Sequence, residues 1–219
     1  MLLLIKYTLL YGIVLMLVAL GGMFSEHSGI INIALEGIMV IGGVAGVLTL
    51  TMLPASLSPF LVVLISILVA ALAGVIYSLL LAFASINLKA DQTIGGTALN
   101  LLAPALVLFF IRIIANQNTL NMASGDSASW FMIKKSTLGI DRSVDLGFFG
   151  ETFINKVYLA TYVCILVFII LSILLYKTRF GLRLRACGEH PQAADSVGIN
   201  VYRMRYAGVL ISGFLGGVG

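Results

Sequence analysis

The sequence predicts an all-α polytopic membrane protein with five complete transmembrane helices and the start of a sixth, one of them broken near residues 25–29. Three observations predict this class: the composition, the length of the apolar runs, and one isolated basic segment. Of the 219 residues, 60% are hydrophobic and only 10% are charged, whereas soluble domains carry about 25% charged residues. The apolar runs are long and continuous, which predicts helices and not a barrel.

Five apolar runs are long enough to cross a bilayer, which takes about 20 helical residues. A sixth begins near the end of the sequence and stops at Gly219, so we expect the sequence to be part of a longer protein. The predicted spans are Tyr7–Phe24, Ile30–Leu53, Phe60–Ala84, Thr93–Ala115, Lys156–Tyr176 and a segment from Tyr206 onward.

Two connections between the predicted spans have a distinct character. Pro54 and Pro59 bracket an expected tight turn. The polar interval Asn116–Asn155 is expected to form a long loop, with short interfacial helices near Trp130 and Phe148.

The net charge of the chain lies in one polar segment, Lys177–Arg205. This segment holds six basic and two acidic residues, a balance of +4. The whole chain has 13 Lys and Arg against 9 Asp and Glu, so the remainder holds seven of each and is neutral. A short basic loop is retained on the cytoplasmic side of a membrane. Counting the spans back from this loop places residues 116–155 and the N-terminus outside.

The middle of the basic segment is predicted to be a short helix. Pro191 suits the first helical position, and Gly198 is a natural stop. Ala193, Ala194 and Val197 would form a small apolar face between them. This helix could dock against another protein, since small side chains allow close approach, or it could be an amphipathic connector resting on the membrane surface.

Polar residues interrupt the second predicted span. Asn32 and Glu36 are four residues apart and are expected to share one helix face, which Gly43 continues. A carboxylate is costly inside a membrane and indicates a functional site by default. The alternative is a hydrogen bond between helices that small residues allow to pack closely.

The fourth predicted span carries a polar stripe in which Gln92, Gly96, Asn100 and Pro104 recur every four residues, with Thr93 beside it. Amide side chains donate and accept hydrogen bonds and could line a path for a neutral polar solute. Helix packing is again the alternative. The translocation-pathway residues that we predict are Asn32, Glu36, Gln92, Thr93 and Asn100.

Several classes of function are disfavoured. The sequence has no nucleotide-binding glycine loop, nucleophile motif or cluster of metal ligands, so we expect no enzyme activity, metal or cofactor. The basic segment lacks the interleaved aromatic residues of a nucleic-acid interface. Lys89 and Asp91 are expected to form a surface ion pair, and the two cysteines no disulfide.

Three stretches resemble one family of transporters. Phe24–Gly37 (FSEHSGIINIALEG) is similar to the S-E-R-S-G-x-x-N-I-x-L-E-G stretch of bacterial ABC-importer permeases for nucleosides, with His27 where Arg is usual. Thr178–Ala194 resembles their T-x-F-G-L-x-x-R-A-x-G-E-x-P-x-A-A loop, and Asp91–Leu102 also matches their pattern. The wider family includes ribose-type sugar and branched-chain amino-acid permeases.

The resemblance implies a single permease transmembrane domain over residues 1–219, C-terminally incomplete, with a cytoplasmic coupling loop at 177–205. The implied partners are an ABC ATPase subunit, a second permease subunit (homologous or identical), an extracytoplasmic solute-binding lipoprotein and the lipid bilayer of the cell membrane. The implied ATPase-coupling residues are Gly188, Glu189, His190, Pro191, Ala193, Ala194, Val197 and Gly198.

The leading hypothesis is therefore the permease subunit of an ATP-driven importer of nucleosides, with purine nucleosides favoured. A simple-sugar permease for ribose or galactose is the runner-up. An ion-coupled secondary transporter would use Glu36 as its ion site, but the sequence shows no internal repeat of the kind such transporters carry. A structural or assembly subunit would need no polar stripes.

Overall fold

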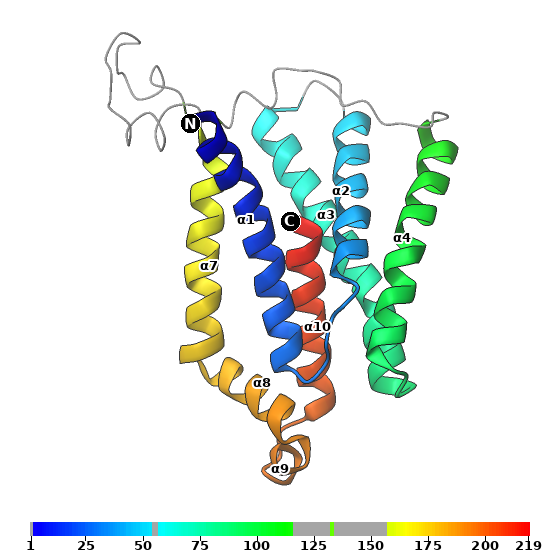
Figure 1. Ribbon diagram of the computed structural model, residues 1–219, viewed down its shortest axis with the longest axis vertical. Coiled ribbons are helices and arrows are strands. Elements are labelled where there is room, and N and C mark those ends of the chain that lie inside the picture. The colour runs from blue at the N-terminus through cyan, green and yellow to red at the C-terminus, as the bar shows by residue number, and fades with distance from the viewer. Residues whose placement is uncertain (1, 54–56, 116–131, 134–156) are drawn as a thin grey trace.

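The computed structural model describes residues 2–53, 57–115, 132–133 and 157–219, and this part of the chain is almost entirely helical (Figure 1). Two short strands are the exception, and they pair antiparallel, Met132 with Tyr158 and Ile133 with Val157. The elements in chain order are α1 Leu2–His27, α2 Leu35–Met52, α3 Pro59–Ala82, the π-helix η1 Phe83–Asn87, α4 Gln92–Ala115, β1 Met132–Ile133, β2 Val157–Tyr158, α7 Leu159–Lys177, α8 Arg179–Glu189, α9 Pro191–Ser196 and α10 Val201–Val218.

The predicted helical membrane class is confirmed. Helices α1 to α4 each contain a stretch long and apolar enough to cross a membrane. Helices α7 and α8 add a fifth crossing if they are counted as one span, with a bend of 65° between them. Helix α10 begins at Val201, five residues before the predicted start of the sixth span. The predicted start of the fifth span, Lys156, lies outside the described residues.

The break between the first two helices lies later than predicted. Helix α1 continues to His27 and α2 begins at Leu35, so the irregular segment is 28–34, which we call the α1–α2 break. Gly29 has a φ of +85°, the left-handed conformation that commonly ends a helix. The polar residues Ser25 and Glu26 were expected to end the helix, but they are accommodated in its last turn.

The basic segment is mostly helical, so the prediction of a loop with one short helix is wrong. Helix α8 occupies its first half and buries Gly181, Leu184 and Cys187 against the rest of the chain. Thr178 caps α8, because its hydroxyl oxygen accepts a hydrogen bond from Gly181 N at 3.3 Å. The segment was predicted as a loop because of its many arginines, although Leu184 and Cys187 are spaced to lie on one face of a helix.

Helix α10 lies inside the bundle, between α1 and α3 (Figure 1). Small residues allow its backbone to approach its neighbours directly. A Cβ atom added at Gly42 of α2 would lie 2.5 Å from the carbonyl oxygen of Gly217, and one added at Gly217 would lie 2.5 Å from that of Ala70. Small residues at helix interfaces are a common packing device in membranes.

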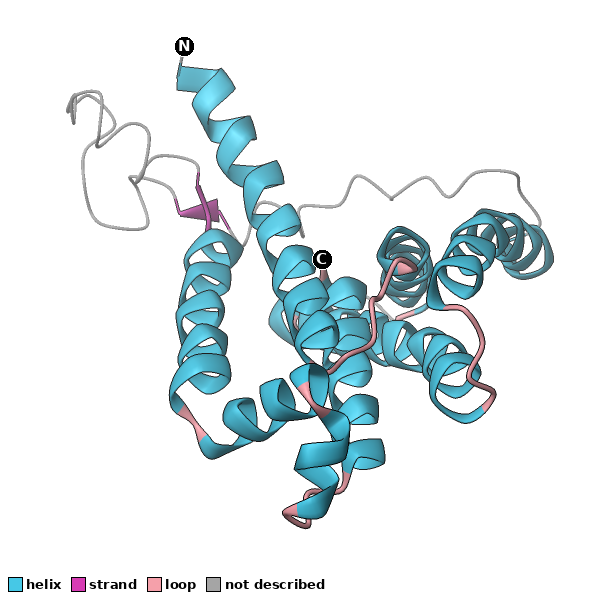
Figure 2. Cartoon of the chain, turned by 60° about the horizontal axis from the view of Figure 1, so that its bottom comes forward, coloured by secondary structure: helices cyan, strands magenta, loops and turns pink. Residues whose placement is uncertain are grey.

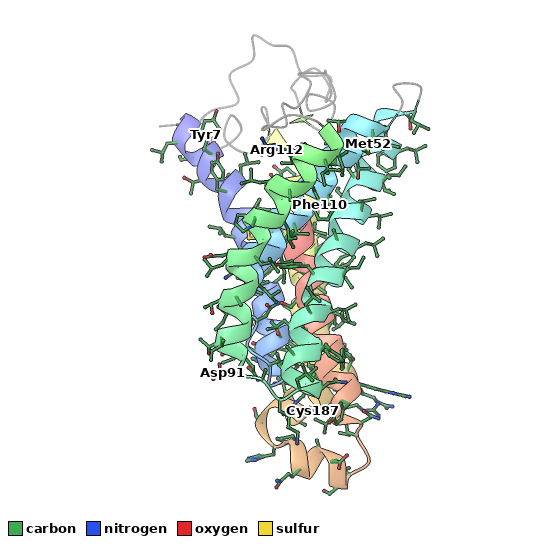
Figure 3. All side chains as sticks on the ribbon, turned by 90° about the vertical axis from the view of Figure 1, so that its right-hand side faces the viewer. Tyr7, Met52, Asp91, Phe110, Arg112 and Cys187 are labelled. Atoms are coloured by element: carbon green, nitrogen blue, oxygen red, sulfur yellow. The ribbon has the colours of Figure 1, made fainter. Side chains whose placement is uncertain are left out.

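One end of the molecule collects three connections: the α1–α2 break, the link from η1 to α4, and α8 with α9 (Figure 1). Figure 2 brings this end forward. Figure 3 shows Asp91 and Cys187 at the same end, with Met52 and Arg112 toward the other. This agrees with the counting of spans; the assignment of this end to the cytoplasm stays a prediction.

The predicted turn between Pro54 and Pro59 lies partly outside the described residues. The predicted long loop at 116–155, with interfacial helices near Trp130 and Phe148, lies outside them apart from β1.

Candidate functional site

The α1–α2 break is stabilised first by two serines, Ser25 in the last turn of α1 and Ser28 in the break itself. Ser25 and Ser28 are fully buried. The Ser25 hydroxyl donates to the carbonyl oxygen of Ile30 at 2.7 Å, and the Ser28 hydroxyl donates to that of Ser25 at 2.6 Å. Backbone groups without helical partners must find others when buried, and these bonds fold the chain back on itself just after α1.

Two amide side chains of α4 bind the backbone of the break and of the first turn of α2. Gln92 Oε1 accepts from Ile31 N at 2.8 Å. Asn100 is bidentate: its Oδ1 accepts from Gly37 N and its Nδ2 donates to the carbonyl oxygen of Ile33, both at 2.8 Å. The predicted polar stripe thus supplies hydrogen-bond partners that the interrupted helix lacks.

Gly96 lies between these two amides and lets the helices meet. A Cβ atom there would lie 2.8 Å from Cβ of Ile33. On the opposite side, Asn32 is only 6% exposed and its Nδ2 donates to Ser212 Oγ of α10 at 2.8 Å. The break is therefore held between α4 and α10.

The predicted pathway residues do not form one cluster. Asn32 lies outside any helix, so the expectation that it shares a helix face with Glu36 is wrong. Glu36 is exposed in the first turn of α2 and has no hydrogen-bond partner among the described residues. Thr93 is also exposed, whereas Gln92 and Asn100 contact the break. That all five line a translocation pathway stays a prediction.

Helix α2 has an open face that begins at Glu36. Val40 is exposed on it, and a Cβ atom added at Gly43 would meet nothing within 4 Å. A carboxylate at the edge of such a face is free to contact a solute or another subunit.

Asp91 caps α4 and forms no ion pair with Lys89, so that prediction is wrong. Its Oδ1 accepts from Thr93 N at 2.7 Å and from Ile94 N at 3.2 Å. Both hydrogen bonds lower the pKa of the Asp91 carboxyl, the one from Ile94 more than the one from Thr93, because they stabilise its charged form. The cap fixes where α4 begins, and so positions Gln92.

Helix α8 contacts the break directly through Gly188. A Cβ atom there would overlap the carbonyl oxygen of His27 and lie 3.1 Å from Gly29 N. Gly188, one of the implied ATPase-coupling residues, lies in the last turn of α8. Because glycine has no side chain, the backbone of α8 can approach the backbone of His27 and Gly29 closely at this point.

Helix α9 forms as predicted at its ends. Pro191 is at its first position, and Gly198, with φ of +84°, follows its C-terminus. Gly198 N donates to Asp195 O at 2.9 Å and Ile199 N to Ala194 O at 3.0 Å, which is the Schellman pattern of a helix end.

The predicted contact face of α9 needs one correction. Ala194 is only 5% exposed, because its side chain faces the protein, whereas Ala193 is exposed and Val197 is 79% exposed. The face open to a partner is therefore Ala193 and Val197. Glu189 and His190, just before α9, are also exposed.

Sequence reasoning missed two residues of this region. Ser212 is the partner of Asn32, and Tyr206 donates its hydroxyl to Asn87 Oδ1 at 2.7 Å, which links α10 to η1. Both lie in the apolar segment at the end of the sequence, where only the small-residue pattern around Ser212 indicated close packing. Among the described residues, no group of His, Cys, Asp and Glu could hold a metal ion.

Residues 4–219 match the family described as branched-chain amino acid transport system / permease component. The chain is 43% identical over 214 residues to the nucleoside ABC transporter permease protein NupC of Lactococcus lactis subsp. cremoris, covering 96% of this chain and 63% of that protein. It is 42% identical over 215 residues to the guanosine ABC transporter permease protein NupQ of Bacillus subtilis, covering 97% and 64%.

A more distant relative is the putative glucose ABC transporter permease protein TsgC13 of Haloferax volcanii, 30% identical over 216 residues, 94% of this chain and 58% of that protein. The chain thus spans less than two thirds of the length of these relatives. No solved structure matches it significantly.

Proposed function

The chain belongs to the branched-chain amino acid transport system permease family, and from this premise we propose that it is the membrane-spanning permease subunit of an ATP-binding-cassette importer of nucleosides. The substrate class follows the printed functions of the two relatives at 43% and 42% identity. In this role the chain is a transport subunit, and a separate ATPase subunit hydrolyses ATP.

The structural observation that carries the proposal is the contact of Gly188 with the α1–α2 break. Helix α9 would dock into the ATPase on the cytoplasmic side with Ala193 and Val197. Because α8 and α9 follow one another directly, a displacement of α9 would move Gly188 against the carbonyl oxygen of His27. The break is tied by Gln92 and Asn100 to α4, so the displacement would reach the membrane helices.

The remaining partners follow from the same assignment. A second permease subunit, identical or homologous, would pair with this one. An extracytoplasmic solute-binding lipoprotein would deliver the nucleoside. The open face of α2 with Glu36 would border the pathway of the solute.

The docking role is tested by Ala193→Trp. Overpacking a tight contact costs about 1–3 kcal/mol, so we expect the variant to lose ATPase co-purification and solute-stimulated ATP hydrolysis while its amount in the membrane is unchanged. Leu88→Trp is the matched control, because Leu88 is exposed at the same end of the molecule but outside α9. Wild-type ATPase binding by Ala193→Trp would contradict the docking role. Ala194→Trp is less informative, since it would overpack the chain itself.

The pathway role of Glu36 is tested by Glu36→Gln. Hydrogen bonds to charged groups contribute about 1.5–3 kcal/mol, so loss of the charge should lower uptake by about tenfold or more while membrane abundance stays constant. The control is Thr51→Val near the other end of α2, which is expected to transport normally. Uptake by Glu36→Gln at the wild-type rate would show that the carboxylate is a spectator.

The substrate is tested by uptake of labelled guanosine, with unlabelled adenosine, ribose, galactose and glucose as competitors. Competition by nucleosides alone supports the proposal. Uptake of labelled ribose, galactose or glucose without uptake of guanosine would favour the second candidate, a simple-sugar permease, for which TsgC13 is the supporting relative. Uptake that follows an ion gradient without ATP would contradict both.

A further inference from the structure

The six basic side chains of the segment 177–205 gather at the end of the molecule that carries α8, and among the described residues none of them forms an ion pair. Two, Arg185 and Arg205, each bury an Nε atom that has no hydrogen-bond partner in this part of the chain. The six are Lys177, Arg179, Arg183, Arg185, Arg203 and Arg205. Two of the six, Arg179 and Arg183, are exposed on α8, so their guanidinium groups are open to an external anion.

The position of α8 brings part of this charge to the membrane boundary. Helix α7 ends at Lys177, and α8 begins two residues later after a bend of 65°. Because α7 is the apolar span, α8 starts at the level where the hydrocarbon ends. Tyr176 is 47% exposed at this corner, and the guanidinium of Arg185 lies 5.3 Å from its ring centroid. Aromatic side chains are enriched at this depth.

The outward face of α8 mixes charge with apolar surface. Its inward residues are Gly181, Leu184 and Cys187, whereas Arg179, Leu182 and Arg183 point away from the bundle and are exposed. Leu182 is 62% exposed although it lies beside two arginines. An apolar side chain flanked by basic ones is the composition of a helix that lies in the membrane interface.

We propose that this face, Arg179, Leu182 and Arg183, binds an anionic phospholipid of the adjacent leaflet. The two guanidinium groups contact the lipid phosphate, since Arg matches phosphate oxygens with paired N–H donors. Leu182 inserts between the acyl chains. The lipid thereby holds α8 in the membrane plane, in the position where Gly188 contacts the break.

An acidic surface of a protein partner is the rival occupant of this face. The lipid is favoured because Leu182 shares the face with the arginines, and because the face adjoins the end of an apolar span. A contact with an acidic protein surface in water would explain the two charges, but it would not explain why an apolar side chain, Leu182, is exposed between them. Helix α9 lies farther from the spans than α8 (Figure 1).

The test compares Arg179→Gln/Arg183→Gln with Lys89→Gln/Arg203→Gln, which removes the same charge from the same end. The full transporter is purified in mild detergent, and its co-purified phosphatidylglycerol and phosphatidylethanolamine are quantified by mass spectrometry. Each basic residue near an anionic surface contributes about fivefold to binding, so the first variant should bind phosphatidylglycerol about thirtyfold more weakly, as measured by titration. The Lys89 and Arg203 variant should bind it like the wild type.

A second measurement guards against misfolding. Arg179→Lys/Arg183→Lys keeps the charge and should retain most of the phosphatidylglycerol. In nanodiscs, added phosphatidylglycerol should raise the unfolding temperature of the wild type and of the lysine variant, but not that of the glutamine variant. Equal lipid loss in both glutamine variants would overturn the proposal, as would unchanged lipid with lost ATPase co-purification, which would assign the face to the protein partner.

Discussion

Replacement of Gly188 by alanine is expected to abolish ATP-driven uptake while the ATPase still binds. The new Cβ would overlap the carbonyl oxygen of His27, and a backbone group cannot swing aside as a flexible side chain can. Helix α8 must therefore separate from the break, at a cost of about 1–3 kcal/mol. The measurements are solute uptake, ATPase co-purification and solute-stimulated ATP hydrolysis for equal amounts of membrane-inserted protein.

The matched control is Gly12→Ala, since a Cβ at that position also meets nothing within 4 Å. It makes the same chemical change on the exposed face of α1 and should be far less harmful. If Gly188→Ala transports at the wild-type rate, the contact between α8 and the break does not carry the coupling. If both variants lose uptake equally, added volume at Gly188 is not the specific cause.

Asn100→Leu is expected to destabilise the protein more than any other single change in the polar stripe. It removes both hydrogen bonds to the backbone, to Gly37 N and Ile33 O. Each buried backbone group left without a partner costs about 1–3 kcal/mol, so the total is about 2–6 kcal/mol. We expect a lower unfolding temperature in detergent and low abundance in the membrane, with uptake lost.

The control for this change is Thr97→Val on the same helix. Thr97 is exposed, and its hydroxyl donates to the carbonyl oxygens of Thr93 and Ile94 within α4, so it connects no other element. Its unfolding temperature should stay near that of the wild type. An Asn100→Leu protein as stable as the wild type, but unable to transport, would instead indicate that Asn100 acts on the solute.

The spans could be predicted from apolar runs, and most of their ends lie close to the predicted residues. The break was placed too early, because Ser25 and Glu26 are poor residues for a buried helix unless their groups find partners. The Ser25 hydroxyl donates a hydrogen bond to the carbonyl oxygen of Ile30, and no local sequence pattern predicts such a bond. Helix α8 was missed because its arginines were counted as charge, although Leu184 and Cys187 recur at helical spacing.

The candidate site was predictable in its residue types but not in its contacts. The four-residue repeat of Gln92, Gly96 and Asn100 indicated a face of α4 that contacts other groups, and in the structure this face packs on the α1–α2 break; its role in translocation stays a prediction. That this face binds the backbone of Gly29 to Gly37 depends on partners more than 60 positions away, which spacing within one helix cannot reveal. The burial of Ala194 likewise depends on how α9 turns against the chain.

The hydrogen bond between Asn32 and Ser212 has a consequence for synthesis of the protein. The two residues are 180 positions apart, and ribosomes add about 5–20 residues per second. Asn32 therefore enters the membrane about 9–36 s before its partner is made. During that interval α1 and α2 are present while the slot later filled by α10 is empty. Insertion must tolerate an amide without its final partner, and a factor that shields it would act on the nascent chain in this interval.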